Sequence, residues 1–108
     1  MWTGRKWYRI GGEVSEILFG ENNIAVVQCG GKDICVALHG DELFAFAYKC
    51  PHASGIMANG YIDPLGNVVC PLHRYKFSMR NGRNVSGEGY YLKTFSVEQR
   101  PEGIFVEV

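Results

Sequence analysis

The chain has 108 residues, of which 46% are hydrophobic, with 11 Lys+Arg against 11 Asp+Glu. This length suits one domain, over residues 1–108, with a core of its own, and it excludes a two-domain enzyme. The net charge of zero argues against nucleic acid as a partner, because phosphate binding requires a surplus of Lys and Arg on one face.

The N-terminal segment lacks the apolar stretch that a signal peptide or a membrane helix requires, and no later run is long enough to span a bilayer. We therefore expect a cytoplasmic protein that has no membrane partner. Thiols stay reduced in that compartment, where cysteines more often serve metal binding or redox chemistry than structural disulfides. The 4 cysteines of the chain thus favour a metal site.

Short apolar segments separated by glycine-rich turns predict an all-β chain, since no segment shows sustained helical spacing of apolar residues. The first half contains expected strands at residues 6–10, 24–29, 33–38 and 43–48. Gly30-Gly31 supplies the positive φ angles of a tight hairpin turn between the second and third strands. This turn places Cys35 nearer Val26 than Cys29, so we expect the two cysteines to remain unpaired as small buried apolar residues.

The next turn is His39-Gly40-Asp41, and we expect His39 to be a solvated loop residue. Residues 50–83 differ in composition, because Gly, Pro and Asn become frequent and the expected strands are short, at 67–69 and 75–78. We interpret this stretch as a loop-built insert. Regular strands resume at residues 92–97 and 104–108.

The insert contains two mixed Cys/His pairs, Cys50-x-His52 and Cys70-x-x-His73, with seventeen residues between His52 and Cys70. A proline directly follows each cysteine and stiffens both loops, because its ring fixes φ. Two such loops facing each other would supply four ligands. Thiolates suit zinc or an iron–sulfur cluster, and imidazole suits zinc, iron or copper, so the ligand types alone leave several metals open.

The two pairs resemble the Rieske iron–sulfur motif, C-x-H followed by C-x-x-H, in which two Cys hold one iron and two His hold the other. The resemblance covers essentially the whole chain and extends to Gly60-Tyr61-Ile62, Phe77 and Asn81-Gly82. It implies one Rieske-type 2Fe-2S cluster. In such a site the buried iron would be bound by Cys50 and Cys70, and the outer iron by His52 and His73.

The chain is most similar to the small soluble Rieske ferredoxins of bacterial ring-hydroxylating oxygenases. The resemblance implies a Rieske fold, with an antiparallel, β-sandwich-like base and an inserted cluster-binding subdomain at about residues 50–83. It also implies a monomeric one-electron carrier, not an enzyme, that passes electrons from a flavin-dependent reductase to a terminal oxygenase by transient docking. A small redox subunit of a nitrite reductase, or of another multi-subunit oxidoreductase, is the alternative.

High-potential members of the Rieske family carry extra groups around the cluster, and this chain has other residues at those places. Gly55 and Leu72 stand where such members have the two cysteines of a bracing disulfide. Tyr75 and Phe77 stand where they have a serine and a tyrosine that donate hydrogen bonds to sulfur. Fewer donors stabilise the reduced state less, so the resemblance predicts a low midpoint potential, ~−150 to 0 mV.

A structural zinc interaction module is the non-redox alternative, although such modules usually begin with a C-x₂₋₄-C pair, which this chain lacks. The chain has 3 His, and only His39 remains once His52 and His73 are assigned. It therefore cannot build the mononuclear iron site of an oxygenase, which needs two His and a carboxylate.

Charge is unevenly distributed along the chain. Between residues 49 and 83 the only acid is Asp63, against five basic residues: Lys49, Arg74, Lys76, Arg80 and Arg83. This excess has two interpretations. It forms either a basic collar that steers an acidic partner surface toward the histidines, or an ordinary solvated face.

Overall fold

The computed structural model describes residues 5–52 and 55–108, so the first four residues of the N-terminal segment lie outside the described part. The strands are β1 (Trp7–Gly11), β2 (Ile24–Cys29), β3 (Lys32–His39), β4 (Glu42–Ala47), β5 (Tyr61–Ile62), β6 (Asn67–Val69), β7 (Lys76–Ser78), β8 (Thr94–Arg100) and β9 (Gly103–Glu107). Two single 3₁₀ turns accompany them, η1 (Val14–Glu16) and η2 (Met57–Asn59). No helix found in the described residues could cross a membrane.

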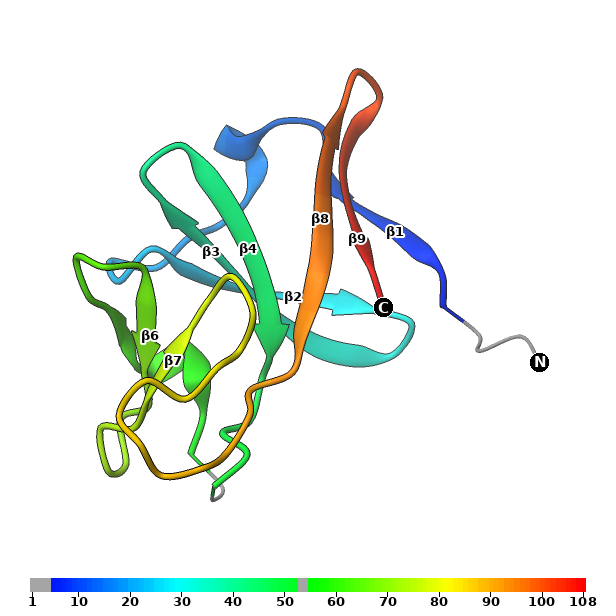
Figure 1. Cartoon of the computed structure of the whole chain (residues 1–108). Helices are drawn as coiled ribbons and strands as arrows, with labels where there is room; N and C mark the ends of the chain where they lie inside the picture. The colour runs from blue at the N-terminus through cyan, green and yellow to red at the C-terminus, as the bar shows by residue number, and fades with distance from the viewer. Residues whose placement is uncertain (1–4, 53–54) are drawn as a thin grey trace.

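The larger of two sheets has six strands in the order β1-β9-β8-β4-β3-β2, and every neighbouring pair is antiparallel. We call these strands the base. The sheet curls so that its edge strands β1 and β2 approach each other (Figure 1). Tyr8 of β1 comes so close to the end of β2 that a β-carbon on Gly30 would lie 2.6 Å from its hydroxyl oxygen. The expected antiparallel, sandwich-like base is therefore confirmed, in a partly barrel-like form.

The hairpin between β2 and β3 forms as the sequence predicts. Gly30 and Gly31 both have positive φ, 59° and 81°, and Val26 lies opposite Cys35. Cys29 and Cys35 are buried and unpaired. Burial raises the pKa of both thiols, and with a contribution from Asp33 it raises that of Cys35 to about 12. Both side chains therefore remain neutral thiols at neutral pH, as apolar core residues do.

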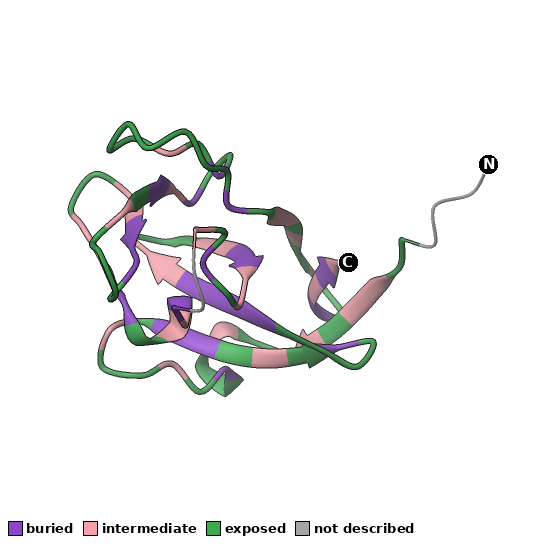
Figure 2. Cartoon of the chain, turned by 90° about the horizontal axis from the view of Figure 1, so that it is seen from below, coloured by how far each residue is buried: buried purple, intermediate pink, exposed green. Residues whose placement is uncertain are grey.

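The smaller sheet has the order β5-β6-β7 and lies beside β3 and β4 (Figure 1). This sheet and the loops around it belong to residues 50–92, which we call the loop subdomain. A core between the sheet and the base contains Phe46 of β4, Met57 of η2, Val68 of β6 and Phe77 of β7. Buried residues follow the strands through the middle of the molecule, whereas the loops are mainly exposed (Figure 2). The loop subdomain thus rests on an apolar face of the base.

Three of the sequence-based expectations are wrong in detail. The strand expected at 92–97 begins at Thr94, and Leu92 is instead a buried loop residue of the shared core. The strand β5 was not expected, because two residues show no alternation. His39 ends β3 and is half-buried, since the turn at Gly66 covers its ring: a β-carbon on Gly66 would lie 3.6 Å from His39 Cδ2.

Candidate metal centre

Each Cys/His pair lies in a tight loop that is closed by a hydrogen bond of its cysteine. In the first loop, after β4, the Cys50 N–H donates to the Gly55 carbonyl oxygen at 2.8 Å. In the second, after β6, the Cys70 N–H donates to the Tyr75 carbonyl oxygen at 2.8 Å, and the Arg74 N–H donates to the Cys70 carbonyl oxygen at 3.0 Å. Arg74 has a φ of 60°, which completes the reversal. The two loops therefore hold their cysteines in equivalent ways.

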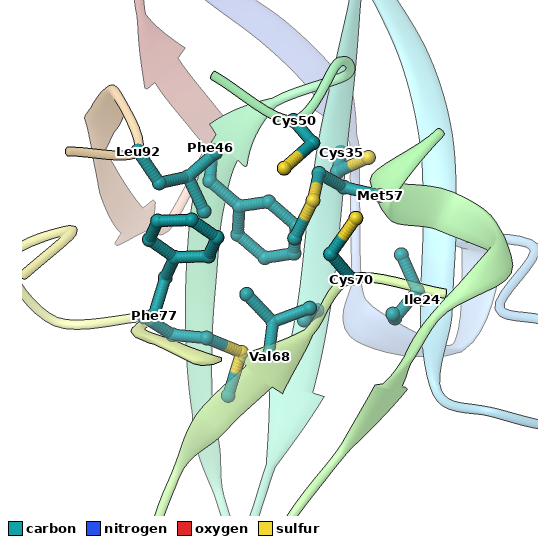
Figure 3. Packing of buried hydrophobic residues seen from close by; sticks show 11 residues of the cluster. Ile24, Cys35, Phe46, Cys50, Met57, Val68, Cys70, Phe77 and Leu92 are labelled. Carbon is teal, nitrogen blue, oxygen red and sulfur yellow. The ribbon is translucent and has the colours of Figure 1, made fainter. Parts of the chain in front are cut away.

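The two cysteines lie at the inner end of these loops. Cys50 is 4% exposed and Cys70 is fully buried, and both belong to the shared core. Their sulfur atoms lie at the same end of that core, next to Met57 (Figure 3). A β-carbon on Gly55 would lie 2.9 Å from Cys70 Sγ. The backbone of the first loop thus packs directly on the sulfur of the second, and the loops face each other.

Gly55 and Leu72 are neighbours in space. A β-carbon on Gly55 would lie 3.3 Å from Leu72 Cδ1. These are the two positions at which the sequence lacks the cysteines of a bracing disulfide. The two loops are in van der Waals contact there.

The two histidines lie together at the surface. Their ring centroids are 4.7 Å apart with an interplanar angle of 70°. His52 is half-buried and His73 is exposed. Within the described part of the chain, His52 Nδ1 is a buried side-chain nitrogen with no hydrogen-bond partner. Leaving such an atom unsatisfied costs about 1–3 kcal/mol, and a metal ion bound at this nitrogen would remove that cost. The imidazole is therefore suited to be a ligand.

Two tyrosines lie over His52. The ring centroid of Tyr75 is 4.1 Å from that of His52, and the ring centroid of Tyr90 is 5.5 Å away. The tyrosines stack on each other at 5.9 Å and 27°. Partial desolvation and the nearby Glu88 carboxylate raise the pKa of Tyr75, so its hydroxyl stays protonated at neutral pH. Tyr90 could not be selected from the sequence, because it lies outside both Cys/His motifs.

The basic excess of residues 49–83 is smaller in space than along the chain. Arg80 pairs with Glu42 of β4 at 2.9 Å, and its guanidinium lies 5.3 Å from the centre of the Phe44 ring. Glu88, whose carboxylate accepts hydrogen bonds from Asn84 and Ser86, adds a negative charge near the Tyr90 ring that packs on His52. Both acids lie outside the 49–83 window, so a count along the sequence omits them. Arg80 therefore does not support the interpretation of the basic residues as a collar, because its charge is paired with Glu42.

The donors are arranged as two pairs at different depths. Among the residues that the structure describes, no three His, Cys, Asp or Glu side chains converge on a point that could hold one metal ion. Two thiols lie in the core, and two imidazoles lie beyond them at the surface. This division matches a binuclear centre in which each iron takes two protein ligands. The site and the fold thus define a small β protein suited to a 2Fe-2S cluster with mixed Cys/His ligation.

Comparison with known proteins identifies the family. Residues 6–95 match the Rieske [2Fe-2S] domain. The chain belongs to this family, and its cofactor is a Rieske-type 2Fe-2S cluster, as the sequence predicts. The anthranilate 1,2-dioxygenase ferredoxin subunit of Burkholderia cepacia is 36% identical over 74% of this chain and 70% of that protein.

Solved structures share the fold. A ferredoxin in a complex of reduced oxygenase and oxidised ferredoxin of carbazole 1,9a-dioxygenase has a TM-score of 0.77 and 24% identity, covering 93% of this chain and 91% of that one. A protein of Mycobacterium tuberculosis, assigned as the small subunit of an NADH-dependent nitrite reductase, has a TM-score of 0.80 and 18% identity, covering 96% of both chains. The expected Rieske fold is confirmed.

Proposed function

We propose that this chain is the ferredoxin component of an oxygenase system, an electron carrier that is not itself an enzyme. Its cluster would be held by Cys50, His52, Cys70 and His73. The observation that carries the proposal is the pair of facing loops, which sets two buried thiols behind two imidazoles at the surface. The relationship to dioxygenase ferredoxin subunits supports the same role.

The two cysteines and the two histidines have different proposed roles. Cys50 and Cys70 lie among apolar side chains, which exclude water from the thiolates. His52 and His73 bring the site to the molecular surface. When bound, a Rieske cluster supplies a one-electron couple, at a higher potential than an all-cysteine cluster because neutral imidazoles replace two thiolates.

The exposed His73 edge is the proposed route for electrons. Leu72 beside it is 51% exposed, and Tyr90 and Tyr91 are 38% and 70% exposed. A short-lived complex with a partner needs only a small interface of this kind. We propose a terminal oxygenase as the acceptor, in line with the oxygenase–ferredoxin complex among the similar structures, and a flavin-dependent reductase as the donor. We further propose a cytoplasmic monomer with one domain over residues 1–108.

The surroundings of the ligands support a midpoint potential in the lower part of the Rieske range. Phe77 is fully buried and has no hydroxyl to donate to sulfur, and Gly55 and Leu72 cannot brace the loops covalently. We expect ~−150 to 0 mV by potentiometric titration. A midpoint above about +150 mV would contradict this assignment.

A role as the small subunit of a nitrite reductase or similar oxidoreductase is the second candidate. The observation that favours it is the match in fold to the Mycobacterium tuberculosis protein. The two roles differ in association, since a shuttle diffuses freely and a subunit does not. Purification of the tagged chain from its native cells separates them. A monomer supports the ferredoxin role, and a stoichiometric complex with a large reductase supports the subunit role.

The test of the proposed ligation uses anaerobically purified protein with iron and sulfide quantified. We expect equal amounts of iron and sulfide, and a rhombic EPR signal after reduction. His73→Cys and His52→Cys should each retain iron but lose the Rieske-type spectrum, because a thiolate replaces an imidazole. A colourless protein that binds zinc would overturn the proposal in favour of the structural module.

A further inference from the structure

Residues 84–91, which we call the tyrosine loop, are built around the side chain of Asn84. Its Nδ2 donates to the Lys76 carbonyl oxygen at 3.0 Å and to Glu88 Oε1 at 3.0 Å. Its Oδ1 accepts from the N–H groups of Glu88, at 2.5 Å, and Gly89, at 2.8 Å. One amide therefore links the loop to β7 and fixes the backbone at its tip.

The same network holds the carboxylate of Glu88. The Ser86 hydroxyl donates to Glu88 Oε1 at 2.5 Å, beside the bond from Asn84. The bonds from Ser86 and Asn84 lower the pKa of Glu88. Glu88 is therefore ionised at neutral pH, and it lies two residues before Tyr90, whose ring centroid is 5.5 Å from that of His52.

The network also determines where Tyr90 lies. Arg83 and Tyr91 form an antiparallel bridge that closes the loop. Between the Asn84 network and this bridge, the ring of Tyr90 packs on His52 and stacks on Tyr75. The loop thus packs one aromatic ring on the half-buried histidine and carries one negative charge two residues before that ring. His73, 6.1 Å from the Tyr75 ring, is exposed.

We propose that Asn84 is a positioning residue that fixes Glu88 and Tyr90 beside His52, and that the Glu88 carboxylate lowers the reduction potential of the site. The inference rests on the proposed ligation by His52. Reduction adds one negative charge, and a fixed carboxylate nearby opposes that addition by Coulomb repulsion. Glu88 is exposed, so salt screens part of this effect. A lower potential makes the protein a stronger electron donor.

The first test is protein-film voltammetry of Glu88→Gln, which removes the charge and keeps the size of the side chain. We expect the midpoint to rise, with the equilibrium shifted about two- to tenfold toward the reduced form, where tenfold corresponds to 59 mV for one electron. The rise should shrink in high salt. The matched control is Glu13→Gln, an exposed acid next to η1, at the far end of the molecule from the tyrosine loop (Figure 1).

The second test measures the positioning role of Asn84. In an Asn84→Ala background, Glu88→Gln should shift the midpoint less than in the wild-type protein, because the carboxylate is no longer held beside His52. If Asn84→Ala does not fold, Ser86→Ala serves the same purpose, since it removes another bond to the Glu88 carboxylate.

The outcomes separate the inference from the proposed function. A protein without iron and sulfide overturns the ligation by His52, and the inference with it. A Rieske EPR signal combined with equal midpoints for Glu88→Gln and Glu13→Gln overturns the charge effect alone. Equal shifts in the two Asn84 backgrounds overturn the positioning role.

Discussion

The base and the loop subdomain are stabilised in different ways. The base has longer strands, such as the eight-residue β3, which pairs in unbroken antiparallel register with β2 and β4, and apolar side chains fill its interior. The strands of the loop subdomain have two or three residues each. Its loops depend on polar side chains that bond to the backbone, such as Asp63, which accepts from the N–H groups of Leu65 and Asn67.

The two regions should therefore respond to substitution for different reasons. Burial of apolar area is non-directional, so the base tolerates changes that keep volume and pattern. The loops need particular donors, acceptors and glycines, because few apolar contacts are available to replace a lost bond. Asn22 joins the regions, since its Nδ2 donates to the carbonyl oxygens of Ala58 and Gly60 at 2.8 and 2.9 Å.

We expect the largest effect, a loss of iron and sulfide, when a cysteine of the loop subdomain is replaced, and no such loss when a cysteine of the base is replaced. Cys70→Ala should abolish iron and sulfide binding, because one iron would lose half of its protein ligands. Cys29→Ala, which removes an equally buried thiol from the base, should keep the full complement. Iron and sulfide analysis of both variants provides the measurement. Full iron content in Cys70→Ala would contradict the assignment of this ligand.

A core substitution in the base should act on stability and leave the site intact. Ile34 is 2% exposed, and Ile34→Ala should lower the free energy of unfolding by about 2–5 kcal/mol in urea titrations. The EPR signal of the folded variant should not change. Val26→Ala, at a position 45% exposed on β2, is the control and should cost about 0.5 kcal/mol or less. Similar losses for both variants would contradict the described packing of β2 and β3.

A glycine substitution in the loop subdomain should affect the metal site before it affects the strands of the base, in contrast to the core substitution in the base. A β-carbon on Gly60, between η2 and β5, would collide with the Val69 carbonyl oxygen. Gly60→Ala should therefore cost about 1–3 kcal/mol and reduce iron retention before it reduces the strand content seen by circular dichroism. Gly11→Ala in β1 is the control, because its nearest contacts are ordinary ones of 3.7 Å. Simultaneous loss of iron and strand content would show that the regions unfold as one unit.

Asp63 makes the stability of the loop subdomain depend on pH. Desolvation would raise its pKa, but the hydrogen bonds from Asn67 and Leu65 prevail and lower it. The ionised form therefore stabilises the fold above the unfolded pKa, and this contribution is lost as the pH falls through the lowered, folded pKa. Asp63→Asn should cost about 1 kcal/mol at pH 7. The difference from wild type should decrease below about pH 4, as urea unfolding at several pH values can show. A difference that grows in acid would contradict this role.

The ion pair that connects the two regions should contribute least. Arg80 and Glu42 are 67% and 60% exposed in their side chains, so water and salt screen their attraction. A double-mutant cycle of Arg80→Ala and Glu42→Ala should give a small coupling energy that is weaker still in 1 M salt. A larger, salt-independent coupling would show that this contact, and not the shared core, holds the loop subdomain to the base.

Local patterns predicted the strands of the base, apart from the start of β8, and the two Cys/His motifs. The Gly30-Gly31 pair predicted the hairpin turn and hence the position of Cys35 opposite Val26, because two-residue turns fix register. The spacing of the Cys/His pairs predicted two facing loops. In contrast, the half-buried state of His39 and the core position of Leu92 depend on contacts with distant segments, which no local period encodes.

Short-range spacing of residue types predicted the all-β class and the hairpin register, and the resemblance of the two Cys/His pairs to the Rieske motif implied the family and its cofactor. The surroundings of the histidines follow from the three-dimensional fold. The fold packs Tyr90 on His52, leaves His73 exposed, and brings Glu42 to Arg80. Packing and electrostatics act between neighbours in space, and chain folding brings together residues that lie far apart in the sequence.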